Sequence, residues 1–252
     1  MLRPVTPAVS MAGLIRTDES PSRAMARCAR LGARAIQLDG TAKGLRAREL
    51  GRSARRDLAA GLRRLELELA GIDLWIPPEH FASGEHADRA LAATAGALGL
   101  AAELAGLLGA GSRAIVSARL PDDERVRAHI ESAAASAGAV LADHATPPSG
   151  SGGEWLRLGL DPAAVLGDGG DPIELAGSRA DRLATARLSD ISAGQRALPG
   201  EAGTRVDPAA YAAVLSLAEG VRHVVIDTGG LERAETRVLG MLDRWGELAR
   251  DR

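Results

Sequence analysis

The sequence predicts an α/β fold of the (β/α)8 barrel type, in which parallel strands form an inner ring and helices cover its outside. Short apolar runs alternate along the chain with longer segments of helical character, as in parallel βα units. Three of these runs, Leu156–Asp161, Leu183–Asp190 and His223–Asp227, each end in an aspartate. The chain has 252 residues, about the length of one such barrel, so residues 1–252 are expected to form a single domain.

The expected strands are short apolar runs bounded by glycine, proline or polar residues. The third is stopped by Pro77 and Pro78, because proline cannot donate a hydrogen bond to a neighbouring strand. In chain order, the eight strands are expected at Pro7–Ala12, Ala35–Asp39, Ile72–Ile76, Ala114–Ala118, Ala139–Asp143, Leu156–Leu160, Ala184–Leu188 and Val224–Ile226.

Amphipathic or alanine-rich segments lie between these runs and are expected to be the outer helices. Asp207 followed by Pro208 predicts a helix start, since an aspartate caps the first turn and proline fits its first position. The sixth helix, around residues 173–179, has the weakest pattern. The expected helices are Ser20–Leu31, Arg48–Leu67, His86–Leu108, Asp122–Ala137, Ile173–Arg179, Pro208–Glu219 and Leu231–Arg250.

Composition excludes several classes of function. Lys and Arg number 31 against 33 Asp and Glu, so no basic excess suggests a nucleic-acid partner. No run of 18 apolar residues occurs and the N-terminal segment lacks a long apolar core, which predicts a soluble cytoplasmic protein without a membrane partner. One cysteine, Cys28, excludes an internal disulfide and fits a reducing compartment.

Polar residues follow several of the expected strands. Asp161, Asp190 and Asp227 stand at the ends of the last three runs, His80 comes after the third strand, and His144 after the fifth. In a closed barrel the carboxyl ends of all strands meet on one face, where active sites of this fold lie. Taken alone, each histidine is as well explained as a loop residue without a role as it is by a functional role. Together with the aspartates, the two histidines favour a polar pocket at this face.

The second half of the chain carries a series of short motifs in a fixed order. They are Leu141–His144, Leu160–Ala163 with Gly170–Pro172, Thr185–Asp190, Arg196–Gly200 and Val224–Asp227. In order and spacing the series resembles the xylose isomerase-like TIM barrels, the sugar phosphate isomerase/epimerase superfamily. The first half agrees more loosely, through Gly32–Asp39 and His80. No single motif is specific, and the likeness lies in the series.

The resemblance implies an enzyme that isomerises or epimerises a small sugar, polyol or sugar phosphate. Its divalent metal (Mn, Mg, Co or Zn) would be held by Glu, Asp, His and Glu, and would polarise a carbonyl or hydroxyl while a carboxylate moves the adjacent proton. Carried over, these ligands fall on Ala142, Asp161, Arg187 and Asp227. Asp161 is kept and Asp227 is a shortened stand-in. These two are the candidate catalytic residues, and the candidate metal ligands if a metal is bound.

Arg187 is the replacement with the largest chemical consequence. A guanidinium is permanently charged and cannot coordinate a cation. Between Asp161 and Asp227 it would replace the positive charge of the metal, so no cofactor is expected and a divalent metal is disfavoured. A salt bridge from Arg187 to either aspartate would support this interpretation. The residues expected to bind the ligand are His80, His144, Arg187, Asp190 and Arg196.

Two hypotheses therefore stand. The protein is an isomerase- or epimerase-like enzyme that acts without the usual metal, or it is a pseudoenzyme or ligand-binding barrel that kept the fold. A third class, the related endonuclease-like barrels with several zinc ions, is disfavoured by five histidines and a formal charge of −2. The expected partner is a small carbohydrate ligand, and a homodimer is left open.

Overall fold

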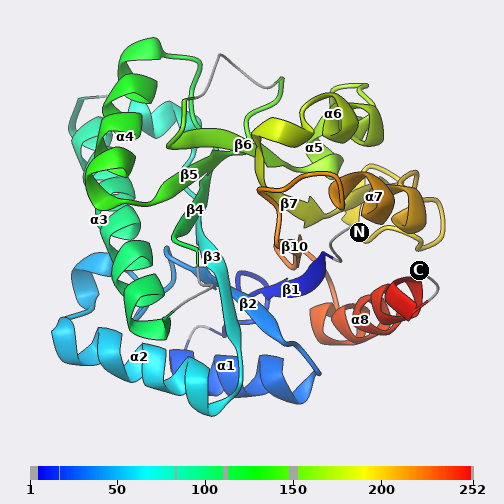
Figure 1. The fold of residues 1–252 in the computed structure, drawn as a ribbon, viewed down its shortest axis with the longest axis horizontal. Coiled ribbons are helices and arrows are strands. Elements are labelled where there is room, and N and C mark those ends of the chain that lie inside the picture. Colours follow the sequence, from blue (N-terminus) through cyan, green and yellow to red (C-terminus); the bar gives the residue numbers. More distant parts are fainter. Residues whose placement is uncertain (1–4, 17, 83, 110–112, 148–152, 251–252) are drawn as a thin grey trace.

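The chain forms a closed ring of eight parallel strands in the computed structural model, which describes residues 5–16, 18–82, 84–109, 113–147 and 153–250 (Figure 1). The order round the ring is β1, β2, β3, β4, β5, β6, β7 and β10, after which β10 pairs with β1. The strands are β1 (Thr6–Ser10), β2 (Ala35–Asp39), β3 (Glu68–Leu74), β4 (Ile115–Ala118), β5 (Val140–Asp143), β6 (Leu156–Leu160), β7 (Leu183–Leu188) and β10 (His223–Ile226).

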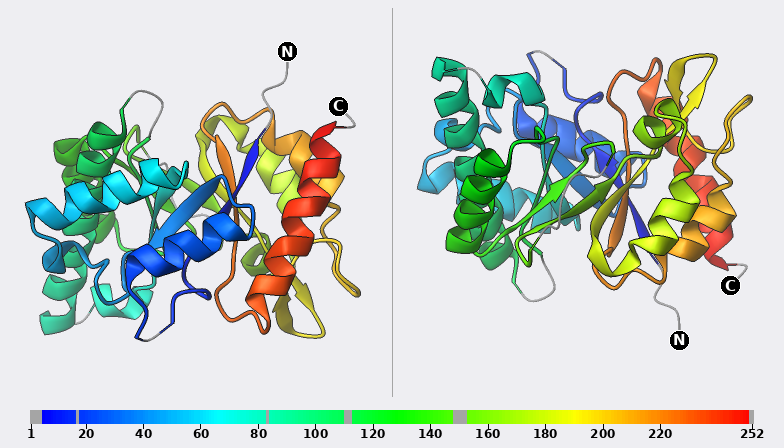
Figure 2. Two further views of the ribbon diagram at one scale, coloured as in Figure 1. Left: turned by 90° about the horizontal axis from the view of Figure 1, so that it is seen from below. Right: turned by 90° about the horizontal axis from the view of Figure 1, so that it is seen from above.

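Helices cover the outside of this ring in both views of Figure 2. The expected cap at Asp207 is confirmed, because its Oδ1 accepts a hydrogen bond from the Ala209 amide at 2.8 Å. The helices are α1 (Pro21–Arg30), α2 (Arg52–Arg64), α3 (Gly84–Leu108), α4 (Glu124–Ala137), α5 (Pro162–Gly167), α6 (Pro172–Ser178), α7 (Pro208–Leu215) and α8 (Ala234–Arg250), with 3-10 turns at Ala47–Glu49, Pro78–Phe81 and Ala180–Arg182.

The expected (β/α)8 architecture is confirmed, while several element bounds differ. The prediction of a single helix at Arg48–Leu67 is wrong, because a 3-10 turn comes first and α2 begins only after Gly51. β3 starts at Glu68, four residues before the expected strand. An antiparallel hairpin, β8 (Asp190–Ser192) and β9 (Gln195–Ala197), was not expected. Its strands of three residues are too short for an alternating pattern to be recognised.

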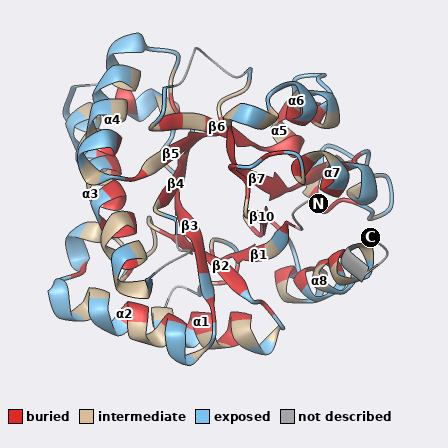
Figure 3. Ribbon diagram, in the orientation of Figure 1, coloured by how far each residue is buried: buried red, intermediate tan, exposed pale blue. Residues whose placement is uncertain are grey.

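Buried strands lie at the centre of Figure 3, and the core of the described residues consists of one large cluster and two small ones. The large cluster fills the space between strands and helices and holds most of the buried Leu, Ile and Val side chains. Inside the ring, one small cluster consists of Ala8, Ala35, Ala70 and Val225. Because these inward-facing side chains are small, the lumen has room for longer polar side chains towards the carboxyl ends of the strands.

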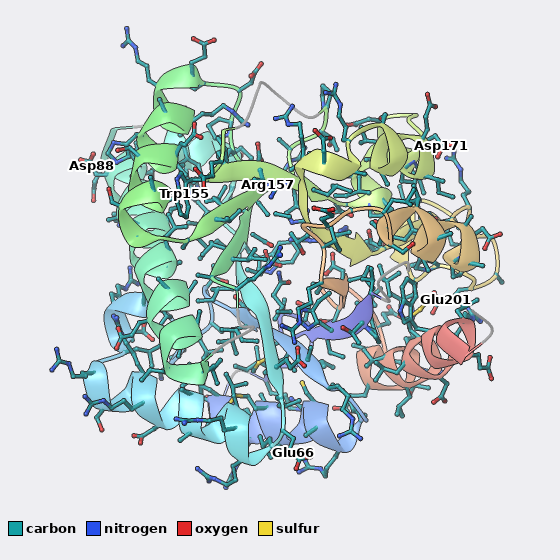
Figure 4. The ribbon with its side chains drawn as sticks, viewed as in Figure 1. Glu66, Asp88, Trp155, Arg157, Asp171 and Glu201 are labelled. Carbon is teal, nitrogen blue, oxygen red and sulfur yellow. The ribbon has the colours of Figure 1, made fainter. Side chains whose placement is uncertain are left out.

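Charged side chains cover the exterior, and Glu66, Asp88 and Asp171 point outward in Figure 4. Among the described residues, only α3 is long and apolar enough to cross a membrane, with 33% of its most apolar window buried. In this fold α3 packs between α2 and α4 and against β3 and β4. Its apolar composition therefore has an explanation in the packing of the barrel.

Candidate functional site

Arg187 on β7 extends across the lumen to the opposite wall of the barrel. Three strands separate β7 from β3 in either direction round the ring. The Nη2 atom of Arg187 donates to both carboxylate oxygens of Asp73 on β3, each at 2.9 Å. Its Nη1 donates to Oδ2 of Asp227 at 3.2 Å and lies 3.7 Å from Oδ2 of Asp161. The expected ion pairs with Asp161 and Asp227 are present, and Asp73 adds a third.

Arg196 approaches the same carboxylates from the solvent side. It lies on β9, and its Nη2 is 2.5 Å from Oδ2 of Asp161 and 2.7 Å from Oδ2 of Asp227. Its side chain is 26% exposed, whereas Arg187 is buried. We call Asp73, Asp161, Asp227, Arg187 and Arg196 the arginine–aspartate cluster. It lies at the carboxyl ends of β3, β6, β7 and β10, which form the barrel mouth.

Neighbouring donors fix the remaining oxygens of two carboxylates. The hydroxyl of Ser189 donates to Oδ1 of Asp161 at 2.6 Å, and the amide of Gly229 donates to Oδ1 of Asp227 at 2.9 Å. Both carboxylates therefore have partners on each oxygen. Hydrogen bonds of this kind favour the ionised form of an acid, and the bond from Ser189 contributes to the lowered pKa of Asp161.

The three carboxylates of the cluster outnumber its two guanidinium groups. Burial raises the pKa of Asp73 to about 7 against the attraction of Arg187, and the nearby carboxylates of Asp227, Asp39 and Asp161 act in the same direction as burial. Asp161 is affected in the opposite way. Burial would raise its pKa, but Arg187, Arg196 and the Ser189 hydrogen bond together lower it. The excess negative charge is thus relieved by proton uptake at Asp73 rather than at Asp161.

Trp75 forms the outer side of the cluster. The guanidinium carbon of Arg187 lies 4.8 Å from the centre of the Trp75 ring, within the range of a cation–π contact. Trp75 is 41% exposed, although most large apolar side chains of this protein are buried. An exposed indole above a buried cation gives the barrel mouth one apolar surface beside the polar groups.

His144 follows β5 and its ring is buried inside the barrel. Neither ring nitrogen has a hydrogen-bond partner among the described residues. Burial and then the charge of Arg187 hold the pKa of His144 well below its ordinary value, so the ring is neutral. A Cβ at Gly159 would lie 2.4 Å from Nε2 of His144, so this position on β6 must be glycine for the ring to fit. The neutral ring is adjacent to the cluster and has free hydrogen-bonding capacity.

Two of the expected ligand-binding residues lie elsewhere. The carboxylate of Asp190 is fully buried and accepts hydrogen bonds from the amides of Ile191, Arg205 and Val206, which closes the base of the β8–β9 hairpin. His80 lies in the turn Pro78–Phe81, and its ring stacks on that of His86 with centroids 5.1 Å apart. The structure therefore brings together Asp161, Asp227, Arg187 and Arg196, with His144 beside them.

Asp73 is the site residue that the sequence did not reveal. The expected strand Ile72–Ile76 contains it as the one charged residue within an apolar run. A buried carboxylate must be paired, so an aspartate in such a strand was the available signal. Its partner could not be named from the sequence, because Arg187 lies 114 positions further along the chain.

Comparisons with known proteins agree on the fold. No family model matches the chain, and no curated protein matches it. A xylose isomerase domain protein from Planctomyces limnophilus superimposes with a TM-score of 0.74 at 14% identity over 98% of both chains. A D-psicose 3-epimerase from Clostridium cellulolyticum H10 gives 0.69 at 11% identity, over 97% of this chain and 99% of that one. The chain has the xylose isomerase-like TIM-barrel fold.

The xylose isomerase-like fold does not by itself select a reaction. A probable 3-DHS dehydratase from Bacillus anthracis also superimposes, with a TM-score of 0.66 at 11% identity over 95% of this chain and 98% of that chain. Isomerase, epimerase and dehydratase names thus occur on one backbone arrangement. The function must be argued from the side chains of this barrel.

The donor set at the mouth of this xylose isomerase-like barrel lacks the arrangement of a metal centre. Within the described ranges, no three His, Cys, Asp or Glu side chains are placed so that they could hold a metal ion. The three aspartates converge on the guanidinium of Arg187. At Ala142 and Arg187 the chain offers no donor, since a methyl group and a permanent cation cannot coordinate a metal.

Proposed function

We propose that the barrel mouth binds a small sugar, polyol or sugar phosphate without a divalent metal. The observation that supports this is the position of Arg187, which pairs with Asp73 and Asp227 and lies within 3.7 Å of Asp161. Arg187 and Arg196 together carry the two positive charges that a divalent ion would supply. Two of the three acidic charges are therefore compensated without a metal, and the raised pKa of Asp73 relieves the third.

The ligand would approach on the side of Arg196, a cluster member that reaches solvent, and of the exposed Trp75 beside the cluster. A guanidinium presents several donors in a planar fork, which suits phosphate oxygens and adjacent hydroxyl groups. The indole offers an apolar face to the C–H groups of a sugar ring. These features support a small polyhydroxylated ligand as the class that fits this mouth.

Binding is favoured over turnover by the state of the two candidate catalytic residues. Asp161 and Asp227 both accept hydrogen bonds from arginine, and the pKa of Asp161 is lowered. A general base works best with a pKa near the operating pH and a free lone pair facing the proton. Asp161 does not meet the pKa requirement, and hydrogen bonds from arginine engage both carboxylates. We therefore infer a ligand-binding barrel that kept the isomerase and epimerase fold.

A metal-independent enzyme is the second candidate, and His144 is the observation in its favour. The ring is neutral and its two nitrogens have no partner among the described side chains, so the ring could hydrogen-bond a ligand hydroxyl and orient it for reaction, while its lowered pKa disfavours proton uptake. This candidate predicts that His144→Gln abolishes turnover of a bound sugar while its affinity stays within about twofold.

Calorimetric titration of the full chain tests the proposal, with ketoses, aldoses, polyols and their phosphates as ligands in the presence of EDTA. We expect at least one compound to bind, and Arg196→Gln to weaken it by about tenfold because an accessible charged donor is lost. Arg205→Gln is the matched control, since Arg205 is exposed in the same loop and its side chain lies outside the cluster. Binding that requires added Mn²⁺ and disappears with EDTA would refute the proposal, and so would no binding at all.

A further inference from the structure

A hollow lies outside the barrel, between β3, the turn Ala47–Glu49, α2 and α3. It has a volume of about 750 Å³. Its apolar walls come from alternate residues of β3 and the segment after it and from residues on α3, namely Ile72, Leu74, Ile76, Ala93, Ala97 and Leu100. None of the arginine–aspartate cluster lines it. We call this hollow the α3 cavity.

Small side chains on α3 explain why the α3 cavity exists. Where the helix passes the turn Ala47–Glu49, a Cβ at Gly96 would lie only 3.3 Å from the Cβ of Ala47, so helix and turn are in close contact there. Beside this contact, Ala92 and Ala93 line the space, and their methyl side chains leave it unfilled. Packed interiors rarely leave a space of this size, whereas ligand pockets are commonly about 300–1,000 Å³.

The rim of the α3 cavity is basic. Arg46, Arg48, Arg55, Arg89 and His80 line it, and the described lining includes no acidic residue. Three of the arginines are paired with nearby glutamates, Arg55 with Glu103 at 2.6 Å, Arg46 with Glu49 at 3.1 Å and Arg89 with Glu85 at 3.5 Å. Arg48 is exposed and makes no hydrogen bond or ion pair with the described residues, although its charge contributes to the lowered pKa of the neighbouring Glu49. One cation at the rim is therefore available.

We propose that the α3 cavity binds a small amphipathic anion, with its apolar body between α3 and β3 and one carboxylate or phosphate at Arg48. Removal of apolar surface from water drives the binding of the body, and the basic rim selects the sign of the head group. The proposal is independent of the function assigned to the barrel mouth, because the two sites share no residue.

Titration with decanoate tests this proposal, and decyltrimethylammonium serves as the probe with the same chain and the opposite charge. We expect decanoate to bind the full chain at least about tenfold more tightly than the cation. Arg48→Glu should remove this preference, since it reverses the free charge at the rim. Ala93→Trp should weaken both probes by filling the space. Arg125→Glu is the matched charge control, because Arg125 is exposed on α4 and does not line the cavity.

The outcomes separate clearly. Loss of decanoate affinity in Arg48→Glu, with Arg125→Glu unchanged and the unfolding transition of both variants intact, supports the site. Equal binding of the anionic and cationic probes would overturn it, since the rim would then play no part. Absence of decanoate binding, or binding that Ala93→Trp leaves unchanged, would equally overturn it.

Discussion

Arg187 and Asp73 form a buried ion pair whose strength depends on the surrounding charges. Removing two charges from water is costly, and the hydrogen bonds from Nη2 of Arg187 to both oxygens of Asp73 offset part of that cost. The additional carboxylates of Asp161 and Asp227 share the same guanidinium. The cluster therefore holds one carboxylate more than its two guanidinium groups can neutralise, and Asp73 is the group whose pKa is raised.

The ionisation of Asp73 gives a pH-dependent stability. Its pKa is about 7 in the folded protein and ordinarily 3.8, so the folded state holds this proton more tightly than the unfolded chain. The free energy of unfolding therefore falls as the pH rises through this window. Relative to Asp73→Asn, which cannot titrate, wild type should lose about 2 kcal/mol between about pH 5 and pH 8 in urea unfolding. A difference that stays constant with pH would contradict the assignment.

The β8–β9 hairpin is the element that carries Arg196 to the mouth. Asp190 begins this hairpin and closes its base through the amides of Ile191, Arg205 and Val206. The sequence interpretation placed Asp190 among ligand-binding residues, whereas its contacts are all with the backbone of this loop. Its contribution to the site is therefore the position of Arg196.

Removal of that anchor should loosen the hairpin. Asp190→Ala leaves three amides without their acceptor, and we expect a loss of about 2–3 kcal/mol in unfolding free energy. Limited proteolysis should then cut between residues 190 and 206. The affinity of Asp190→Ala for a sugar at the mouth should also fall, as expected for Arg196→Gln, because the hairpin no longer positions Arg196. Asp171→Ala is the control, since Asp171 caps α6 through the amides of Ile173 and Glu174. Equal protease resistance of wild type and Asp190→Ala would show that the anchor is not needed.

Closure of the barrel places residues from four strands around one point. Because a guanidinium occupies that point, we expect that about 1 mM Mn²⁺ leaves the Tm of wild type unchanged, since only a ligand bound by the folded state raises it. The double variant Ala142→Glu, Arg187→His restores two donors beside Asp161 and Asp227. Its Tm should rise with Mn²⁺, whereas Ala142→Gln, Arg187→Asn should not respond. Stabilisation of wild type by Mn²⁺ would refute the replacement of the metal by arginine.

The sequence by itself determined the barrel and much of its mouth. Alternating apolar runs and helical segments predicted the eight strands, and strand ends predicted Asp161 and Asp227 at one face because parallel strands place their carboxyl ends together. The resemblance to xylose isomerase-like barrels placed Arg187 between these two aspartates. Local patterns carry this information, since burial of each strand depends on its own residues. The ends of the elements were less exact, as β3 and α2 show.

Only the tertiary structure decided which side chains meet. Asp73 and Arg187 pair because their strands lie opposite each other in the ring. The distance across the lumen between these two strands is set by the closure of all eight strands. His80 and Asp190 lie outside the arginine–aspartate cluster, because the direction of a side chain beyond a strand end depends on the loop that follows. A sequence pattern fixes the spacing along a strand, while contacts across a lumen depend on every strand between them.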